Sequence, residues 1–382
     1  MDSGKSTLVE AITGKWPAVH SEELKRGITI KLGYADATIY RCKKCKRFMT
    51  SDKCLSCAEV CEAERTVSFV DAPGHETLMA TVIAGASLMD GAILIIAADE
   101  KCPQPQTVEH LTSLEIAGIK HIVIAQNKVD LVTPERARES YSEIKAFIKG
   151  TIAEKAPIIP VSAQKKINID LMLDAIQEHI PTPERKTGDA RMYIVRSFDV
   201  NKPGTDIKKL HGGVIGGAIK QGALKVGDEI EIRPGVKVGE KWQTLKANVV
   251  GLQKAGMDLD EAGAGGLLGL MTTLDPGLTK ADSLSGNVAG KNLPPVLNRL
   301  RIRAKLFKDL VGREGKIDPI KLGEPLMINV GTARTIGMIK SQKKDTVEID
   351  LKLPVCAEAG ERAVLSRRIG DRWRLIGFGD IQ

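Results

Sequence analysis

The chain has 382 residues, and 56 lysines and arginines against 48 acidic residues give it a formal net charge of +8. With 42% hydrophobic and 27% charged residues, its composition is that of a globular protein of two or three domains, which excludes intrinsic disorder. No apolar run approaches the roughly 20 residues of a membrane-spanning helix, and the polar start does not read as a signal peptide.

The first half of the chain alternates short apolar runs with amphipathic stretches. The apolar runs predict buried strands of a parallel sheet at residues 66–70, 92–97, 121–126 and 157–161. The stretches between and before them predict helices at residues 6–13, 76–89, 106–117 and 134–149. This alternation is typical of a doubly wound, mostly parallel sheet, so we predict an α/β domain over residues 1–183.

The second half has short strand-like runs punctuated by glycine. Residues 181–189 break helix and strand alike and read as a linker. The runs at 212–222 and 226–232 predict a small antiparallel β-barrel over residues 190–293. A second break at Leu293-Pro294-Pro295 precedes runs at 301–307, 325–330, 332–340 and 346–351. These predict another antiparallel β-barrel over residues 294–382.

Five of the seven cysteines lie between Cys42 and Cys61. Without a secretory signal, such a cluster favours a metal site over disulfides and a cytoplasmic protein. The spacing Cys42-x2-Cys45-x8-Cys54-x2-Cys57 supplies two thiolate pairs, which suits tetrahedral zinc in an insert at residues 41–61. Cys61 is then a spare. The insert is also basic, but such a charge run is more often a solvated face than an RNA contact.

Gly4-Lys5-Ser6 matches the end of a phosphate-binding loop, G-x-x-x-x-G-K-[ST], at the start of the first predicted helix. In such a loop, backbone amides surround the phosphates, the lysine neutralises charge, and the hydroxyl, here Ser6, holds Mg²⁺. Alone, the tripeptide would more often start a surface helix. The motifs that follow along the chain support its interpretation as a phosphate-binding loop.

Three further motifs each close a predicted strand. Asp71-Ala72-Pro73-Gly74-His75 offers a carboxylate for Mg²⁺ and a glycine amide for the γ-phosphate. In Asn127-Lys128-Val129-Asp130, the final carboxylate can accept guanine N1–H and the 2-amino group, a donor pair that adenine lacks. Amides of Ser162-Ala163-Gln164 could meet guanine O6. The nucleotide-binding residues predicted in this way are Asp2, Gly4, Lys5, Ser6, Thr7, Asp71, Gly74, Asn127, Lys128, Asp130, Ser162, Ala163 and Gln164.

This set of motifs resembles the translational GTPases, which are related to elongation factor Tu. Arg26-Gly27-Ile28-Thr29-Ile30 looks like their first switch segment. The resemblance implies that Thr29, with Ser6 and Asp71, coordinates Mg²⁺ and senses the γ-phosphate. It also implies that His75 orients the attacking water and that Ile28 forms part of an apolar gate beside it. His75, Thr29 and Ile28 are therefore the predicted catalytic residues.

A narrower resemblance is to the γ subunit of archaeal and eukaryotic translation initiation factor 2, with the brevity of the chain favouring the archaeal form. It is carried by residues 20–36, 196–205 and 372–377 and covers essentially the whole chain. It implies a P-loop GTPase domain followed by two barrels, with GTP or GDP, Mg²⁺ and Zn²⁺ as cofactors. It also implies delivery of methionyl initiator tRNA to the small ribosomal subunit, with GTP hydrolysis as the release switch and α and β subunits as partners.

The chain departs from the family pattern at its start. The family has an apolar strand and Gly-His before Asp2-Ser3-Gly4-Lys5, and a valine where Met1 stands. We therefore expect the DNA upstream of Met1 to encode these residues in frame.

Two alternative functions remain open at this point. A degenerate, nucleotide-free scaffold subunit is favoured by the shortened loop and opposed by the intact Asp71, His75 and Asp130. An elongation factor for another aminoacyl-tRNA, such as the selenocysteine-specific factor, is opposed by the cysteine insert and the switch sequence.

Overall fold

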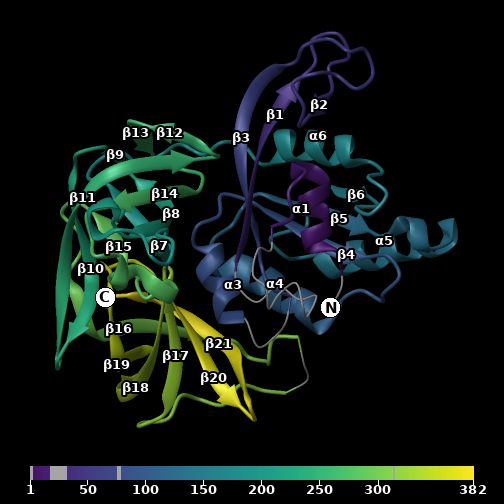
Figure 1. Ribbon diagram of the computed structural model, residues 1–382. Coiled ribbons are helices and arrows are strands. Elements are labelled where there is room, and N and C mark those ends of the chain that lie inside the picture. The colour runs from purple at the N-terminus through teal and green to yellow at the C-terminus, as the bar shows by residue number, and fades with distance from the viewer. Residues whose placement is uncertain (1–2, 18–31, 75–78, 313–314) are drawn as a thin grey trace. The chain divides into compact units, whose positions relative to one another are not determined.

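The computed structural model describes residues 3–17, 32–74, 79–312 and 315–382 (Figure 1). The fold divides into two compact units, Met1–Pro183 with Val311–Glu314, and Glu184–Leu310 with Gly315–Gln382. No described helix has both the length and the hydrophobicity that crossing a bilayer would require.

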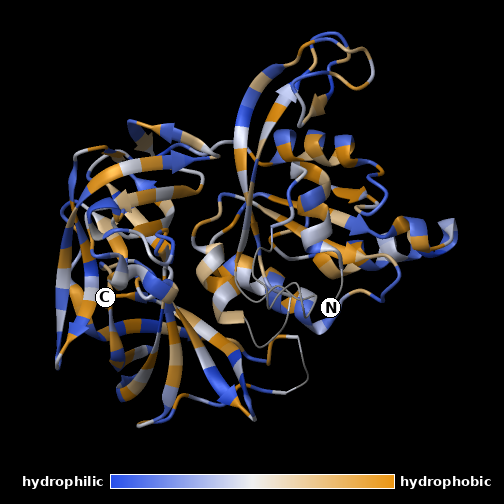
Figure 2. Ribbon diagram, in the orientation of Figure 1, coloured by the Kyte–Doolittle hydropathy of each residue, from blue (hydrophilic) through white to orange (hydrophobic). Residues whose placement is uncertain are grey.

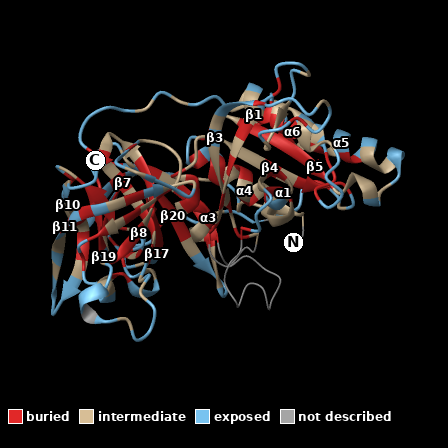
Figure 3. Ribbon diagram, turned by 45° about the horizontal axis from the view of Figure 1, so that its top comes forward, coloured by how far each residue is buried: buried red, intermediate tan, exposed pale blue. Residues whose placement is uncertain are grey.

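The first unit contains the predicted parallel sheet. Its strands β4 (Ala92–Ala97), β5 (Ile122–Asn127) and β6 (Ile158–Pro160) lie in the order β4-β5-β6. The central strand β5 is buried at every position, as expected for a parallel strand covered on both faces. Figure 3 shows buried residues gathered along this sheet and exposed residues along α5 (Pro134–Ile148). The helices of this unit are α1 (Lys5–Thr13), α3 (Met79–Ala86), α4 (Pro105–Ile116), α5 (Pro134–Ile148) and α6 (Ile169–His179).

Helices cover both faces of the parallel sheet. Alternate residues of β5 point to opposite faces. On one face, Val123 and Ala125 pack in a core with residues of α1 and α6. On the other, Ile122 and Ile124 pack in a core with residues of α4 and α5. This two-sided packing confirms the α/β class predicted from the alternation of apolar runs and amphipathic stretches.

The helix boundaries follow local signals. Helix α1 ends at Thr13, because Gly14 takes the left-handed conformation (φ 70°) that closes a helix, as predicted. The first residues of the helix predicted at 76–89 lie outside the described residues, and α3 covers its middle. Helix α6 was missed, although the apolar spacing of Ile169, Met172, Leu173 and Ile176 is that of a helix packed on a core.

One predicted strand is placed in the wrong sheet. Residues 66–70 belong to β3 (Glu62–Asp71), which pairs antiparallel with β1 (Gly33–Arg41) and not with the parallel strands. The short strand β2 (Phe48–Met49) lies on the other edge of β1. The prediction was wrong because residues 42–61 turn the chain back after β1, so that β3 runs beside β1 in the opposite direction. This ribbon carries the cysteine insert at its tip (Figure 1).

The second unit begins with a barrel. Strands β10, β15, β7, β8, β14 and β11 are neighbours in that order, and pairing of β10 with β11 closes the ring. Its core includes Met192, Ile194, Ile215 and Leu270. The strands of this region are β7 (Arg191–Phe198), β8 (Val214–Gln221), β9 (Ala223–Lys225), β10 (Glu229–Val238), β11 (Lys241–Lys254), β12 (Met257–Leu259), β13 (Glu261–Gly263), β14 (Leu268–Thr272) and β15 (Val288–Gly290).

A second closed barrel follows, in the order β16-β19-β18-β17-β20-β21. Figure 2 shows hydrophobic and hydrophilic bands alternating along the barrel strands, the period of two that puts one side of each strand in the core. The two barrels confirm that part of the predicted fold class. The strands are β16 (Val296–Leu306), β17 (Pro325–Val330), β18 (Ala333–Lys343), β19 (Thr346–Cys356), β20 (Arg362–Ile369) and β21 (Arg372–Ile381).

Contacts within the second unit join the two barrels. Arg191 of β7 donates to Glu358 at 2.7 Å. Beside this pair, Tyr193 packs in a small apolar cluster with Val288, Leu293 and Cys356. The break predicted at Leu293-Pro294-Pro295 is therefore a fixed connection between two packed barrels.

Candidate functional site

The predicted nucleotide-binding motifs lie at the carboxyl edge of the parallel sheet. The carboxyl ends of β5 and β6 are neighbours, since Val129 N–H donates to Val161 O at 3.3 Å. Helix α1 begins after Gly4, where φ is +86°. Ligands of open α/β sheets bind at this edge because the strand-to-helix loops converge there.

Asn127 connects three of the four motifs. Its side-chain amide donates to Ser3 O at 2.8 Å, and its Oδ1 accepts from Ala163 N–H at 3.0 Å. Only 2% of Asn127 is exposed. A Cβ on Gly4 would lie 2.3 Å from Asn127 Nδ2, so this position requires glycine for space as well as for its positive φ. Segments more than a hundred residues apart are thus held together by one buried side chain.

Ser6 and Asp71 meet at the start of α1. The Ser6 hydroxyl donates to Asp71 Oδ2 at 2.5 Å, and Asp71 is only 2% exposed. A hydroxyl and a carboxylate side by side supply oxygen ligands of the kind that Mg²⁺ prefers. The donor set therefore fits the magnesium site predicted for these two residues.

The other phosphate-loop residues lie close to this pair. Lys5 Nζ donates to Ser3 Oγ at 3.5 Å, and Thr7 follows Ser6 in the first turn of α1. Gly74 lies in the segment that follows β3.

His110 of α4 lies near this loop. Burial is the main cause, and the positive charge of Lys5 the second cause, of a pKa lowered to about 4, so this imidazole stays neutral near pH 7.

The base-reading motif forms a tight turn after β5. Lys128 has a left-handed backbone (φ 63°) and its ammonium lies 3.2 Å from Asp99 Oδ2. A hydrogen bond from the Ser162 side chain lowers the pKa of Asp130; burial opposes this, and Lys165 adds to it. Asp130 is therefore an ionised acceptor at neutral pH, which the recognition of two guanine donors requires.

The Ser162-Ala163-Gln164 turn differs in one detail from the expectation. The amide of Ala163 already donates to Asn127, so it is not a free donor for guanine O6. The amide of Gln164 makes no hydrogen bond within the described part of the chain. Sequence reasoning also missed Ser3 and Lys165, and only the second had a signal, as a cation directly after a base-reading turn.

Four predicted residues lie outside the described residues: Asp2, Ile28, Thr29 and His75.

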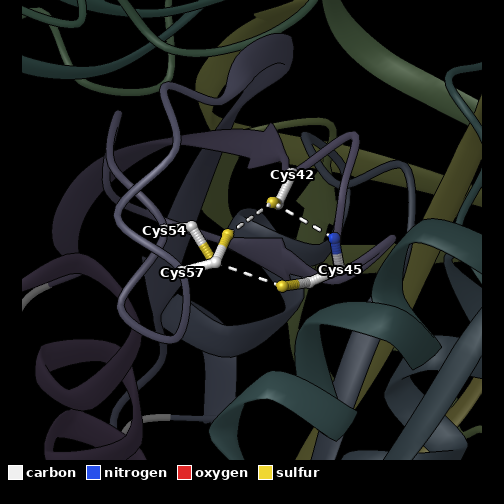
Figure 4. Close-up of side chains that lie close together, drawn as sticks. All are labelled: Cys42, Cys45, Cys54 and Cys57. Carbon is white, nitrogen blue, oxygen red and sulfur yellow. Dashed lines mark hydrogen bonds between the residues drawn. The ribbon is translucent and has the colours of Figure 1, made fainter.

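The cysteine insert brings four sulfurs together (Figure 4). The Sγ atoms of Cys42, Cys45, Cys54 and Cys57 all lie within 4.8 Å of one another. The Cys42–Cys57 distance is 3.6 Å and the Cys45–Cys54 distance is 3.8 Å. Tetrahedral zinc with Zn–S bonds of about 2.3 Å requires sulfurs about 3.8 Å apart. These residues therefore fit a structural zinc site.

The two cysteine pairs sit on matching turns. Cys42 N–H donates to Arg47 O and Lys46 N–H to Cys42 O, and the bonds from Cys54 to Glu59 and Ala58 to Cys54 repeat this pattern. Backbone amides of Ser56 and Cys57 lower the pKa of Cys54 to about 6, whereas hydrogen bonds from Cys57 and Cys54 raise the pKa of Cys45 to about 12, so without a metal the thiolate charge is concentrated on Cys54. Cys61 instead lies 3.5 Å from Met49 Sδ, outside the four-sulfur group.

Ala58 closes the second turn with a left-handed backbone (φ 59°), which is unfavourable for a residue with a side chain. We expect Ala58→Gly to stabilise the insert by about 0.5–1 kcal/mol, since glycine adopts this conformation without strain. Slower proteolysis within residues 41–61 than in the parent chain would show this stabilisation. As a control, Ala63→Gly in β3 should destabilise, because glycine weakens a strand. Faster cleavage of Ala58→Gly would show that the turn is not strained.

The insert is fastened to two helices of the first unit. The Thr50 hydroxyl donates to Ile12 O at 2.8 Å, near the end of α1. Arg47 lies 3.7 Å from Asp170 in the first turn of α6. These helices follow the phosphate loop and the Ser162-Ala163-Gln164 turn, so the insert packs on the helices that border the candidate nucleotide site.

Two family models match the chain. The elongation factor Tu GTP-binding domain matches residues 1–182, and the C-terminal domain of initiation factor eIF2 gamma matches residues 298–381.

Full-length relatives are also similar to the chain. Translation initiation factor 2 subunit gamma of Methanothermobacter thermautotrophicus is 55% identical over 100% of this chain and 97% of the relative. The proteins of the same name from Methanocaldococcus jannaschii and Pyrococcus furiosus are each 56% identical over 100% of this chain and 95% of the relative. The chain belongs to the family of translation initiation factor 2 gamma subunits. It is therefore a GTPase of translation initiation. The resemblance stated from the sequence is confirmed, and neither alternative is favoured.

Solved structures agree on the fold. The bacterial selenocysteine-specific elongation factor EF-Sec is 24% identical with a TM-score of 0.77, covering all of this chain and 56% of that one. Elongation factor SelB of Methanococcus maripaludis, in complex with the GTP analogue GPPNHP, is 20% identical with a TM-score of 0.73, covering all of this chain and 77% of that one. At these identities the likeness concerns the fold alone, so it does not restore the elongation-factor alternative.

Proposed function

We propose that this gamma subunit binds methionyl initiator tRNA when GTP is bound and delivers it to the small ribosomal subunit. Hydrolysis of GTP to GDP then loosens the complex and releases the tRNA. The observation that carries the proposal is the identity of 55–56% along the whole chain with initiation factor 2 gamma subunits. The α and β subunits of the factor are its proposed partners, and the cytoplasm is its proposed location.

The proposed phosphate site uses the start of α1. Asp2, Gly4, Lys5 and Thr7 bind the phosphates, and the amide of Gly74 approaches the γ-phosphate. Ser6 and Asp71, joined at 2.5 Å, hold Mg²⁺ together with Thr29. When bound, the metal neutralises phosphate charge that develops during transfer.

The proposed base site uses the ends of β5 and β6. Asp130 accepts hydrogen bonds from the guanine donors. Asn127 holds the phosphate loop and the Ser162-Ala163-Gln164 turn together, and Lys128 completes the motif. O6 meets the turn of Ser162, Ala163 and Gln164, where the Gln164 amide is the better placed donor because the Ala163 amide is already engaged. The proposed catalytic group is His75, which orients water, with Ile28 as part of the gate beside it.

The proposed zinc ligands are Cys42, Cys45, Cys54 and Cys57, supported by the sulfur distances of 3.6 and 3.8 Å. Their role is structural, because no ligand position is left open for a substrate. The proposed domain limits are 1–183, 190–293 and 294–382, with the insert at 41–61.

Binding of initiator tRNA tests the proposed function. With the α subunit present, we expect methionyl initiator tRNA to bind at least about tenfold more tightly with a non-hydrolysable GTP analogue than with GDP, since only the triphosphate offers the γ-phosphate that Thr29 is proposed to sense. Fluorescently labelled tRNA gives the dissociation constants. Elongator methionyl-tRNA and selenocysteinyl-tRNA serve as controls and should bind weakly in both states. Equal affinity for initiator tRNA with either nucleotide would contradict the proposal.

A further inference from the structure

A lysine forms an ion pair with Asp130, the carboxylate that is proposed to read guanine. Lys165 Nζ lies 3.4 Å from Asp130 Oδ2. The Lys165 side chain is 60% exposed, whereas the Asp130 side chain is 9% exposed. A largely exposed lysine is therefore paired with an almost buried carboxylate.

The backbone of the same residue fixes this arrangement. Lys165 N–H donates to Ser162 Oγ at 3.2 Å. The Ser162 side chain is also the largest cause of the lowered pKa of Asp130. Lys165 thus contacts both residues, Ser162 through its backbone amide and Asp130 through its side chain.

We propose that Lys165 is a latch on the base pocket, a side chain that pairs with Asp130 and withdraws when guanine binds. The inference rests on the proposed role of Asp130. Guanine N1–H and the 2-amino group each need a position on one carboxylate oxygen, and the ammonium beside Oδ2 competes for one of those positions. Displacing the ammonium costs free energy, which lowers the apparent affinity for the nucleotide.

The other lysines of the site do not share this position. Lys128 is paired with Asp99 at 3.2 Å and so does not compete for Asp130. Lys166, next in the chain, is exposed and forms no ion pair within the described ranges. Its amide donates to Ala163 O at 3.3 Å, so it belongs to the same turn. Lys166 is therefore a matched control for charge and location.

The test compares Lys165→Met, Lys165→Arg and Lys166→Met with the parent chain. Methionine keeps most of the stem and removes the charge. We expect Lys165→Met to bind GDP about threefold to fivefold more tightly, the range set by an exposed ion pair. Lys165→Arg and Lys166→Met should bind GDP with the parent affinity. The advantage of Lys165→Met should shrink as salt is raised from 0.05 to about 0.5 M, because salt screens the latch.

The measurement is the dissociation constant of a fluorescent GDP analogue, with thermal melting as a check of folding. An unchanged or weaker affinity in Lys165→Met overturns the latch, since a residue that helps to hold the base would give a loss. If Lys165→Met does not fold, Lys165→Gln replaces it, with the same expectation. Asp130→Asn separates the two levels of the proposal. If it fails to weaken GDP, the base site is wrong; if it weakens GDP while Lys165→Met does not tighten it, only the latch is wrong.

Discussion

Asp130→Asn should weaken GTP binding by about 3 kcal/mol, a hundredfold or more, while weakening xanthosine triphosphate far less. Asp130 is almost buried, and the Ser162 side chain keeps its pKa low, so it presents an ionised acceptor to the base. Replacing it with an amide removes two charge-assisted hydrogen bonds and sets an amide donor against guanine N1–H or its 2-amino group. Xanthine has a carbonyl oxygen where guanine has the 2-amino group, so the same amide can donate to it.

Competition binding with the two triphosphates measures this change of preference. Asp52→Asn, an exposed aspartate of the cysteine insert, is the control and should leave both affinities unchanged. Equal losses for GTP and xanthosine triphosphate in Asp130→Asn would show that this carboxylate does not read the base.

The second large effect concerns the metal. Purified protein should contain about one zinc per chain, because the four sulfurs already stand at tetrahedral spacing. Changing Cys42 or Cys54 to serine should release it, since loss of one thiolate from a structural site removes much of an apparent binding free energy of about 10 kcal/mol or more. Residues 41–61 should then become accessible to protease.

The rest of the first unit should survive this loss. Its core around β5 is built from α1 and α6 and includes no cysteine of the insert. GDP affinity should therefore stay within about threefold of the parent value. Cys61→Ser is the control and should keep its zinc, because Cys61 lies against Met49 outside the cluster. Natively folded protein without metal, or zinc loss from Cys61→Ser, would contradict the four-cysteine assignment.

Much of the candidate site could be predicted from the sequence, because each motif is a local pattern at the end of a recognisable strand. The apolar run at 121–126 fixes where Asn127 and Asp130 fall, and the carboxyl ends of parallel strands share an edge. The cysteine spacing likewise predicts the cluster, because each Cys-x2-Cys pair sits on one short turn. Periodicity and turn chemistry depend on neighbours a few residues away, which a sequence displays directly.

The tertiary structure alone decided how distant segments pair. β3 reads as a buried strand, but its antiparallel partner β1 depends on where residues 42–61 return the chain. The bond of Asn127 to Ala163 and the pairing of Lys165 with Asp130 join segments about 35 residues apart, and no local pattern shows which group each of these residues contacts. A single donor or acceptor has several possible partners in an extended chain, and only the packed fold selects one of them. The sequence by itself therefore determined the motifs and the class of domain, whereas the fold decided which of their hydrogen-bonding groups remain available to a nucleotide.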